Sequence, residues 1–135
     1  MEINLKTYNI NDPVYVNLIK WRVEKIREWQ QKYFKDAVHY MDIGCGSWPF
    51  PMEFDNRANI DLIAIEPDPV MRSDTEKNIK GKFKSELLDS GHWDNGVART
   101  YSEMIDVAMS CEVYEHIKDD FIFNMNTVLK ADGYA

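Results

Sequence analysis

The stretch Asp42-Ile43-Gly44-Cys45-Gly46-Ser47 decides the fold, because two glycines one residue apart follow a short apolar segment. Glycine lets the backbone turn sharply and come close to a ligand, since no Cβ blocks the approach. Such a pair standing alone is explained equally well by a plain tight turn. Here it follows a predicted strand over residues 37–41 with Asp42 ahead of it, which favours a ligand-binding loop at the end of that strand.

Beyond this loop, short apolar runs alternate with helical or loop segments, the pattern of a parallel sheet with crossover helices. We predict strands over residues 37–41, 61–65, 83–88 and 105–110, which end at Asp42, Glu66, Asp89 and Ser110. The sequence thus predicts an α/β fold, a Rossmann-like three-layer sandwich with a mainly parallel sheet. Ligands of such sheets bind outside the carboxyl ends of the strands, so these strand ends are the candidate site.

Three helices are predicted around the sheet. Asp12 and Pro13 open the first, whose apolar residues recur every three or four positions at Tyr15, Ile19, Val23, Ile26, Trp29 and Tyr33. Asp68 caps a second helix that runs from Pro69 to about Lys80 and stops at Gly81. The third covers residues 119–130, with Phe121, Ile122, Met125, Val128 and Leu129 on one face and Gly133 as its stop signal. We expect residues 1–36 to be a helical segment packed on the sheet and residues 37–135 to form the ligand-binding domain.

Glu66 ends the second predicted strand, twenty residues past Gly46. A carboxylate about twenty residues past such glycines is where a nucleoside ribose is held, its two oxygens accepting hydrogen bonds from the vicinal hydroxyls. The pair of glycines and Glu66 therefore point to a nucleoside-containing cofactor.

Four stretches in this order resemble class I S-adenosylmethionine-dependent methyltransferases. They are residues 41–46 (MDIGCG), 63–68 (IAIEPD), 105–117 (IDVAMSCEVYEHI) and 128–133 (VLKADG). By that resemblance, S-adenosylmethionine (SAM) is the cofactor, Gly44, Cys45 and Gly46 line its methionine part, and Asp42 interacts with its amino group. Glu66 then holds the ribose hydroxyls, Asp89 lies near the adenine, and backbone around Ser110 and Cys111 closes the site beneath the sulfonium. A sulfonium and an ammonium both favour an acidic pocket.

The chain departs from the family pattern after the glycines. Trp48-Pro49-Phe50-Pro51 stands where a third glycine usually opens a helix, and two prolines make a regular helix improbable before Met52. We therefore expect Trp48 or Phe50 to pack where that helix would lie. The same stretch weakens a rival nicotinamide dinucleotide hypothesis, since a pyrophosphate needs both a third glycine and a helix N-terminus. Residues 90–101 have no clear family counterpart, so Asp89 can equally be an ordinary turn aspartate.

Methyl transfer is an in-line displacement that needs little beyond positioning, so a general base is optional. His116 is the candidate base, with Glu112 and Tyr114 behind it, and a structural histidine that packs or caps the following helix is the alternative. His39 and His92 have no supporting constellation. No metal-ligand cluster and no Ser-His-Asp order stands out.

Composition limits the partners. The chain has 135 residues and a net charge of -7; residues 1–40 carry +2 and residues 41–135 carry -9, which disfavours a nucleic acid partner. Two cysteines are too few for a disulfide framework, and the apolar runs are too short for a membrane span. The N-terminus lacks a signal-peptide pattern, so a cytoplasmic protein is the default.

We expect SAM-dependent methyl transfer to a small molecule, or alternatively an inactive cofactor-binding or protein-interaction module of the same fold. Family members build seven strands, whereas this chain ends where we expect a fifth to begin. The sheet is therefore expected to stop after about four strands, and its open edge favours pairing with another chain as a homo-oligomer.

Overall fold

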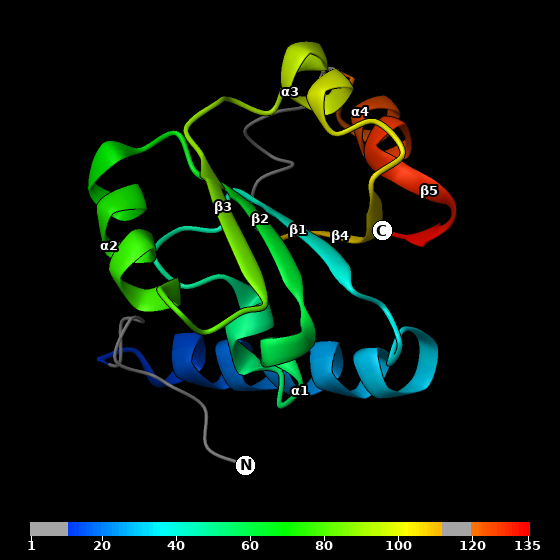
Figure 1. The fold of residues 1–135 in the computed structure, drawn as a ribbon. Helices are drawn as coiled ribbons and strands as arrows, with labels where there is room; N and C mark the ends of the chain where they lie inside the picture. Colours follow the sequence, from blue (N-terminus) through cyan, green and yellow to red (C-terminus); the bar gives the residue numbers. More distant parts are fainter. Residues whose placement is uncertain (1–10, 112–119) are drawn as a thin grey trace.

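A computed structural model of the chain describes residues 11–111 and 120–135 (Figure 1). Five parallel strands form one sheet in the order β3-β2-β1-β4-β5. They are β1 (His39–Ile43), β2 (Asp61–Ile65), β3 (Ser85–Asp89), β4 (Ile105–Ser110) and β5 (Leu129–Tyr134). The chain builds outward from β1 in one direction and from β4 in the other. The topological switch point, where ligands of such sheets bind, therefore lies between β1 and β4.

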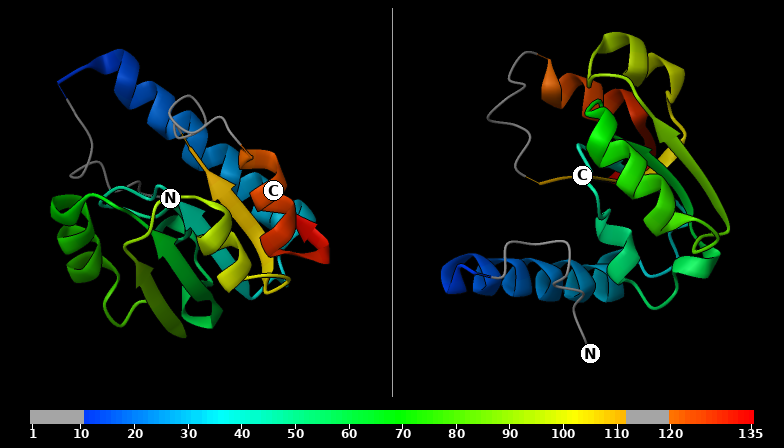
Figure 2. Two further views of the ribbon diagram at one scale, coloured as in Figure 1. Left: turned by 90° about the horizontal axis from the view of Figure 1, so that it is seen from above. Right: turned by 90° about the vertical axis from the view of Figure 1, so that its left-hand side faces the viewer.

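Helices cover both faces of the sheet, which confirms the three-layer α/β prediction (Figure 2). On one face, α1 (Pro13–Tyr33), α2 (Pro69–Ile79) and the short 3₁₀ helix η2 (Phe50–Glu53) pack around Tyr40, Leu62 and Ala64. A second 3₁₀ turn, η3 (Arg57–Asn59), precedes β2. On the other face, α3 (Asn95–Thr100) and α4 (Phe121–Val128) pack on Met41, Ile43 and Ile65. Neighbouring strand residues point to opposite faces, so both layers bury apolar side chains.

Helices α1 and α2 begin at the capping residues that the sequence predicts. The carboxylate of Asp12 accepts hydrogen bonds from the backbone N–H groups of Val14 and Tyr15, and Asp68 does the same at the start of α2. Both caps precede a proline at the first helical position. Gly81, with φ of 71°, lies two residues past the end of α2 and takes the left-handed conformation that glycine tolerates best.

Strand boundaries agree with the sequence prediction where apolar runs are sharply bounded. β2 and β4 have the predicted limits. β1 and β3 begin two residues later than predicted and also end later. Asp42 is therefore the next-to-last residue of β1 and Asp89 the last residue of β3, whereas both were predicted to follow their strands. The side chain of Asp106 accepts the backbone N–H of Val38 at 3.1 Å, just before β1 begins.

A fifth strand replaces the end of the predicted last helix. That helix was expected to reach Lys130 with Gly133 as its stop, but α4 ends at Val128 and residues 129–134 form β5 beside β4. Leu129 pairs with Ile105, and the Lys130 ammonium lies 2.7 Å from a carboxylate oxygen of Asp106. These long-range contacts outweigh the local helical pattern, so the sheet has one strand more than the roughly four expected.

α1 buries a narrower stripe than its sequence predicts. Ile19 and Val23 are buried, whereas Trp29 and Tyr33 remain about half exposed. Gln30 is buried instead, and its side-chain N–H donates to Asn56 Oδ1 at 2.8 Å. The amino-terminal end of α1 projects beyond the sheet (Figure 2), whereas Trp29 and Tyr33 near its other end line a hollow beside β4. The division of the chain at residue 36 stays a prediction.

The carboxylate of Asp106 contacts several groups at the amino-terminal ends of the strands. Besides Lys130 and the Val38 N–H, its carboxylate accepts the backbone N–H of His39 at 2.8 Å and lies 3.0 Å from the His39 ring. Burial would raise the pKa of Asp106, but these donors, led by Lys130, hold it well below its usual range. Within the described residues, none of the helices is both long and apolar enough to cross a membrane.

Candidate functional site

The glycine loop, residues 44–47, is hydrogen-bonded to the end of β2. Gly44 and Gly46 have positive φ values of 66° and 61°, a backbone conformation that residues with a Cβ rarely adopt. The backbone N–H groups of Gly44 and Cys45 both donate to the Ile65 carbonyl, at 2.8 and 3.1 Å. A Cβ built on Gly46 would meet no atom within 4 Å, so the backbone there is open to an approaching ligand.

Helix α2 holds the same loop from the other side. The Thr75 hydroxyl, which is fully buried, lies between the carbonyl oxygens of Gly46 and Met71. The Asn78 side chain donates to the Ser47 carbonyl at 2.8 Å. The loop conformation is therefore fixed by backbone atoms that bond to β2 and α2.

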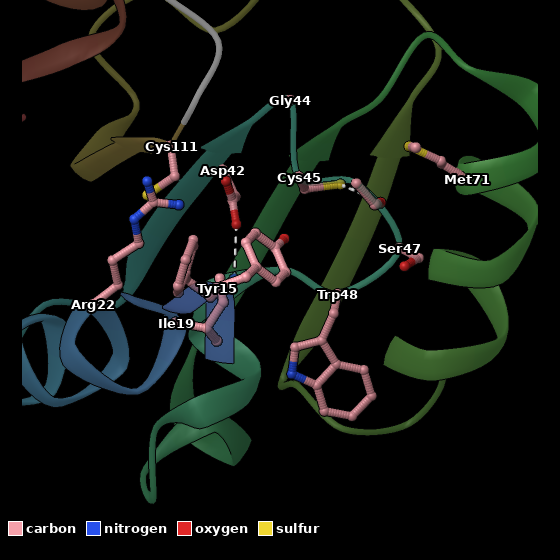
Figure 3. A pocket seen from close by; sticks show the side chains of 12 residues that line it. Tyr15, Ile19, Arg22, Asp42, Gly44, Cys45, Ser47, Trp48, Met71 and Cys111 are labelled. Carbon is pink, nitrogen blue, oxygen red and sulfur yellow. Dashed lines mark hydrogen bonds between the residues drawn. The ribbon is translucent and has the colours of Figure 1, made fainter. Parts of the chain in front are cut away.

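A cavity of about 270 Å³ opens at the carboxyl end of β1, beside this loop. Figure 3 shows it lying between the glycine loop, the start of α1 and the end of β4. Its lining consists of Tyr15, Ile19, Arg22, Asp42, Gly44, Cys45, Gly46, Ser47, Trp48, Phe50, Met71 and Cys111. Five of the seven cofactor-binding residues predicted from the sequence therefore line one cavity. Glu66 and Asp89 do not line it.

Asp42 is the buried charge of this cavity. Its side chain is 1% exposed, and one carboxylate oxygen accepts the Phe50 backbone N–H at 2.8 Å (Figure 3). Within the described part of the chain, the other oxygen accepts no hydrogen bond. Burial raises the pKa of Asp42 to about 7, with a smaller contribution from the negative charge of Glu66. A cation placed beside this group would stabilise its ionised form.

Arg22 supplies the opposite charge, and the sequence analysis did not single it out. It projects from α1 toward Cys111 at the end of β4, across the cavity from the glycine loop (Figure 3). A guanidinium and a carboxylate on one cavity wall match the two charges of an α-amino acid. No local motif marks Arg22, because its place depends on how α1 crosses the sheet.

The stretch that replaces the usual helix is fixed by a buried ion pair. Glu53 is 5% exposed and lies 3.1 Å from the Arg27 guanidinium of α1, while its other carboxylate oxygen accepts the Trp48 indole N–H at 2.8 Å. Phe50 packs against Ile19 and Val23 of α1. The prediction that no regular α-helix forms here is confirmed, because only the 3₁₀ turns η2 and η3 lie between the loop and β2.

Glu66 lies next to the glycine loop and supports it. One carboxylate oxygen accepts the Gly46 N–H and the other accepts the Asp68 N–H, both at 2.9 Å. Each carboxylate oxygen has two lone pairs, so each retains one acceptor position. Glu66 thus has a structural task that the sequence did not reveal, and it keeps the capacity to accept two more hydrogen bonds.

Asp89 is the last residue of β3 and bonds within its own neighbourhood. Its carboxylate accepts the Gly91 N–H at 2.7 Å and the Tyr101 hydroxyl at 2.5 Å. Burial and this hydrogen bond raise the pKa of Tyr101 above its usual value. The backbone of Asp89 pairs with Ile65 and accepts the Glu66 N–H, so Asp89 lies on the same sheet edge as the cavity.

Both cysteines line the cavity and neither forms a disulfide. Burial, followed by the charges of Asp42 and Glu66, raises the pKa of the Cys45 thiol, so this group is an uncharged, small side chain at neutral pH. His116, with Glu112 and Tyr114, lies outside the described residues. His39 lies far from the cavity, at the amino end of β1, between Asp106 and Asp61.

No family model and no curated protein matches the sequence, but many solved structures share the fold. A SAM-dependent methyltransferase from Leishmania major has a TM-score of 0.72 at 12% identity, over 87% of this chain and 48% of that one. The DszA carbon methyltransferase has a TM-score of 0.70 at 10% identity, over 90% and 35%. The plantazolicin methyltransferase BpumL, solved in complex with SAH, has a TM-score of 0.60 at 14% identity, over 92% and 50%.

These likenesses show that the chain has the class I fold of SAM-dependent methyltransferases. The fold predicted from the glycine loop and the four sequence stretches is therefore confirmed. The chain spans between about a third and a half of the length of these three proteins.

Proposed function

We propose that the chain binds SAM in the cavity beside the glycine loop and transfers its methyl group to a small-molecule acceptor. The observation that carries the proposal is the buried Asp42 carboxylate, which lines the cavity and has one oxygen that accepts no hydrogen bond from the described residues. Burial makes this carboxylate costly to ionise, and an ammonium group in the cavity would relieve that cost.

The donor set of the cavity fits the amino-acid part of SAM. Asp42 would accept from the ammonium, Arg22 would pair with the carboxylate, and the open backbone at Gly46 would let the ligand approach closely. The cavity of about 270 Å³ is near the lower limit of ligand pockets, which are on the order of 300–1,000 Å³. We therefore place only the methionine part inside it and the nucleoside along the sheet edge.

Glu66 is our candidate for the ribose hydroxyls, since it retains one acceptor position on each oxygen. Asp89 follows it along the edge and is the candidate for the adenine, although both of its oxygens already accept hydrogen bonds. Bound SAM would supply an electrophilic methyl group attached to a sulfonium. The chain's task is then to orient the acceptor and exclude water, and His116 stays a candidate base.

Calorimetry with SAM and with S-adenosylhomocysteine (SAH) tests the proposal, using Asp42→Asn and, as a matched charge change on exposed Asp132, Asp132→Asn. Asp42→Asn should weaken SAM binding by about 10- to 100-fold, because a charge-assisted hydrogen bond contributes roughly 1.5–3 kcal/mol. Asp132→Asn should bind like the wild type. Absence of binding by both ligands at millimolar concentration would refute the proposal.

Turnover distinguishes the enzyme from the inactive module of the same fold. Methyl transfer to any member of a broad acceptor panel, measured by SAH release, supports the enzyme. Tight SAM binding without SAH release across the panel favours the cofactor-binding or protein-interaction module.

Two further expectations concern partners. The net charge of -7 disfavours a nucleic acid acceptor. β5 and β3 are the outer strands of the sheet, and pairing of an open edge with a second copy remains our prediction. Sedimentation of the chain in solution tests it, and a monomer at high concentration would contradict it.

A further inference from the structure

A second hollow adjoins the cofactor cavity on the opposite side of Arg22. It measures about 290 Å³ and is lined by Trp21, Arg22, Lys25, Ile26, Trp29, Ser110 and Cys111. Arg22 and Cys111 belong to both linings, so the two spaces share a wall. A ligand in this second hollow would therefore lie next to a ligand in the first.

The α1 wall of this hollow combines indole rings with cations. Its five residues from Trp21 to Trp29 are spaced one, three, one and three positions apart, which places them along one side of the helix. Trp21 is 55% exposed and Trp29 is 46% exposed, although large aromatic residues are usually well buried. Exposed indoles beside a hollow are typical of surfaces that bind flat apolar groups.

The β4 wall carries a polar group without a partner. The Ser110 hydroxyl is buried and makes no hydrogen bond within the described part of the chain. Buried hydroxyls are almost always hydrogen-bonded, and each exception calls for an explanation. Rotation of this side chain toward the hollow would let the hydroxyl bond to a ligand oxygen or nitrogen.

The charge of the hollow favours an anionic ligand among flat apolar ones. Lys25 lines the hollow, and among the residues that the structure describes no carboxylate lines it, although the whole chain has a net charge of -7. The Lys25 ammonium lies 2.8 Å from Glu28 on the helix surface. The side chains of this pair are 39% and 57% exposed, so exchanging Glu28 for an anionic ligand would cost little.

The hollow continues into an apolar space of about 380 Å³. The two share Ile26, Trp29, Ser110 and Cys111, and the second adds mainly aromatic and aliphatic side chains of α1, β4 and α4. The combined space offers a polar end near Lys25 and Ser110 and an apolar body beyond Trp29. A ligand with an anionic group on a flat, apolar ring system matches this arrangement.

We propose that the hollow lined by Trp21, Lys25, Trp29 and Ser110 is the acceptor site, and that the acceptor is an aromatic carboxylic acid. This inference rests on the proposed function for its role in methyl transfer, but the binding of an aromatic anion can be tested alone. The indoles contact the ring system, Lys25 attracts the carboxylate, and the Ser110 hydroxyl bonds to a ring substituent.

Ligand-detected NMR with 1-naphthoate as the probe tests the site, with 1-naphthalenemethanol as its uncharged counterpart. Trp29→Ala should weaken naphthoate binding by about tenfold and Lys25→Gln by about two- to fivefold. Lys20→Gln, an exposed lysine of α1 outside the hollow, is the matched control and should bind like the wild type. Added salt should weaken naphthoate binding more than naphthalenemethanol binding.

Equal binding of the two probes, or wild-type affinity in both Trp29→Ala and Lys25→Gln, would overturn the proposal. SAH binding is measured on the same samples and should be unchanged in these variants, which also shows that they are folded. If SAH fails to bind the wild type while naphthoate binds as described, the methyltransferase proposal falls and the aromatic-anion site stands.

Discussion

Replacing Asp42 by asparagine tests how this buried carboxyl group changes the free energy of unfolding with pH. Burial raises the pKa of Asp42 from 3.8 to about 7 in the folded chain. Between these values the folded state holds a proton that the unfolded state has released, so this group makes stability fall as pH rises. A pKa difference of one corresponds to about 1.4 kcal/mol, so the full effect is about 4 kcal/mol.

Asparagine does not titrate, and its side-chain oxygen can still accept the Phe50 N–H. The variant therefore lacks the pH-dependent loss. Its free energy of unfolding, relative to the wild type, should increase by about 3.7 kcal/mol between pH 4 and pH 8. The unpaired amide nitrogen adds a destabilising offset of about 1–3 kcal/mol that is the same at every pH. The slope against pH, not the value at one pH, is therefore diagnostic.

Urea unfolding followed by circular dichroism at pH 4, 5, 6, 7 and 8 measures this difference, with equal denaturant slopes as the check that both proteins unfold alike. Asp132→Asn, the exposed counterpart, should give a nearly flat difference. A flat profile for Asp42→Asn would refute the reasoning, since Asp42 would then titrate like an exposed aspartate. A profile that falls with pH would mean that the folded chain stabilises the ionised form.

Three other predictions test other parts of the fold. Asp106→Asn should lower the free energy of unfolding by about 1–3 kcal/mol at pH 7 and by less near pH 3. The lowered pKa of Asp106 contributes stability that is lost as pH falls, and urea unfolding at the two pH values measures this difference. Glu53→Ala should cost about 3 kcal/mol, because Arg27 keeps only the backbone carbonyl of residue 53 as acceptor and loses the carboxylate, and a double-mutant cycle with Arg27→Ala should show strong coupling. Met125→Ala should cost about 2–5 kcal/mol, whereas Ile122→Ala on the exposed face of α4 should cost less than about 0.5 kcal/mol; similar costs would show that α4 packs differently.

The sequence predicts the elements whose signals are local. Asp68 with Pro69 fixes the start of α2, and the apolar runs of β2 and β4 are bounded by polar residues, so these elements appear where expected. β5 could not be predicted in this way. Its residues Lys130, Asp132 and Gly133 have low strand preference, and they adopt a strand because β4 offers a partner and Asp106 offers an ion pair.

The residues of the candidate site also fall into two groups, those marked by a local sequence pattern and those placed by long-range packing. Gly44, Gly46 and Asp42 were predicted because they follow a strand in a recognisable order, and the structure places them around one cavity. Arg22 and Tyr15 were not predicted as lining residues, because α1 reaches the cavity only through packing between segments distant in sequence. The double use of Glu66, as loop support and as candidate ribose ligand, could not be foreseen, since it depends on backbone hydrogen bonds.

The hydrogen bonds that suspend the glycine loop have a thermodynamic consequence for binding. Ile65, Glu66, Thr75 and Asn78 already restrain residues 44–47, and Glu66 does so while each of its carboxylate oxygens retains one acceptor position for a ligand. The conformational entropy of ordering the loop is therefore lost when the chain folds, not when a ligand arrives. Association should proceed without a slow isomerisation step, and its heat-capacity change should reflect only the surface that the ligand covers.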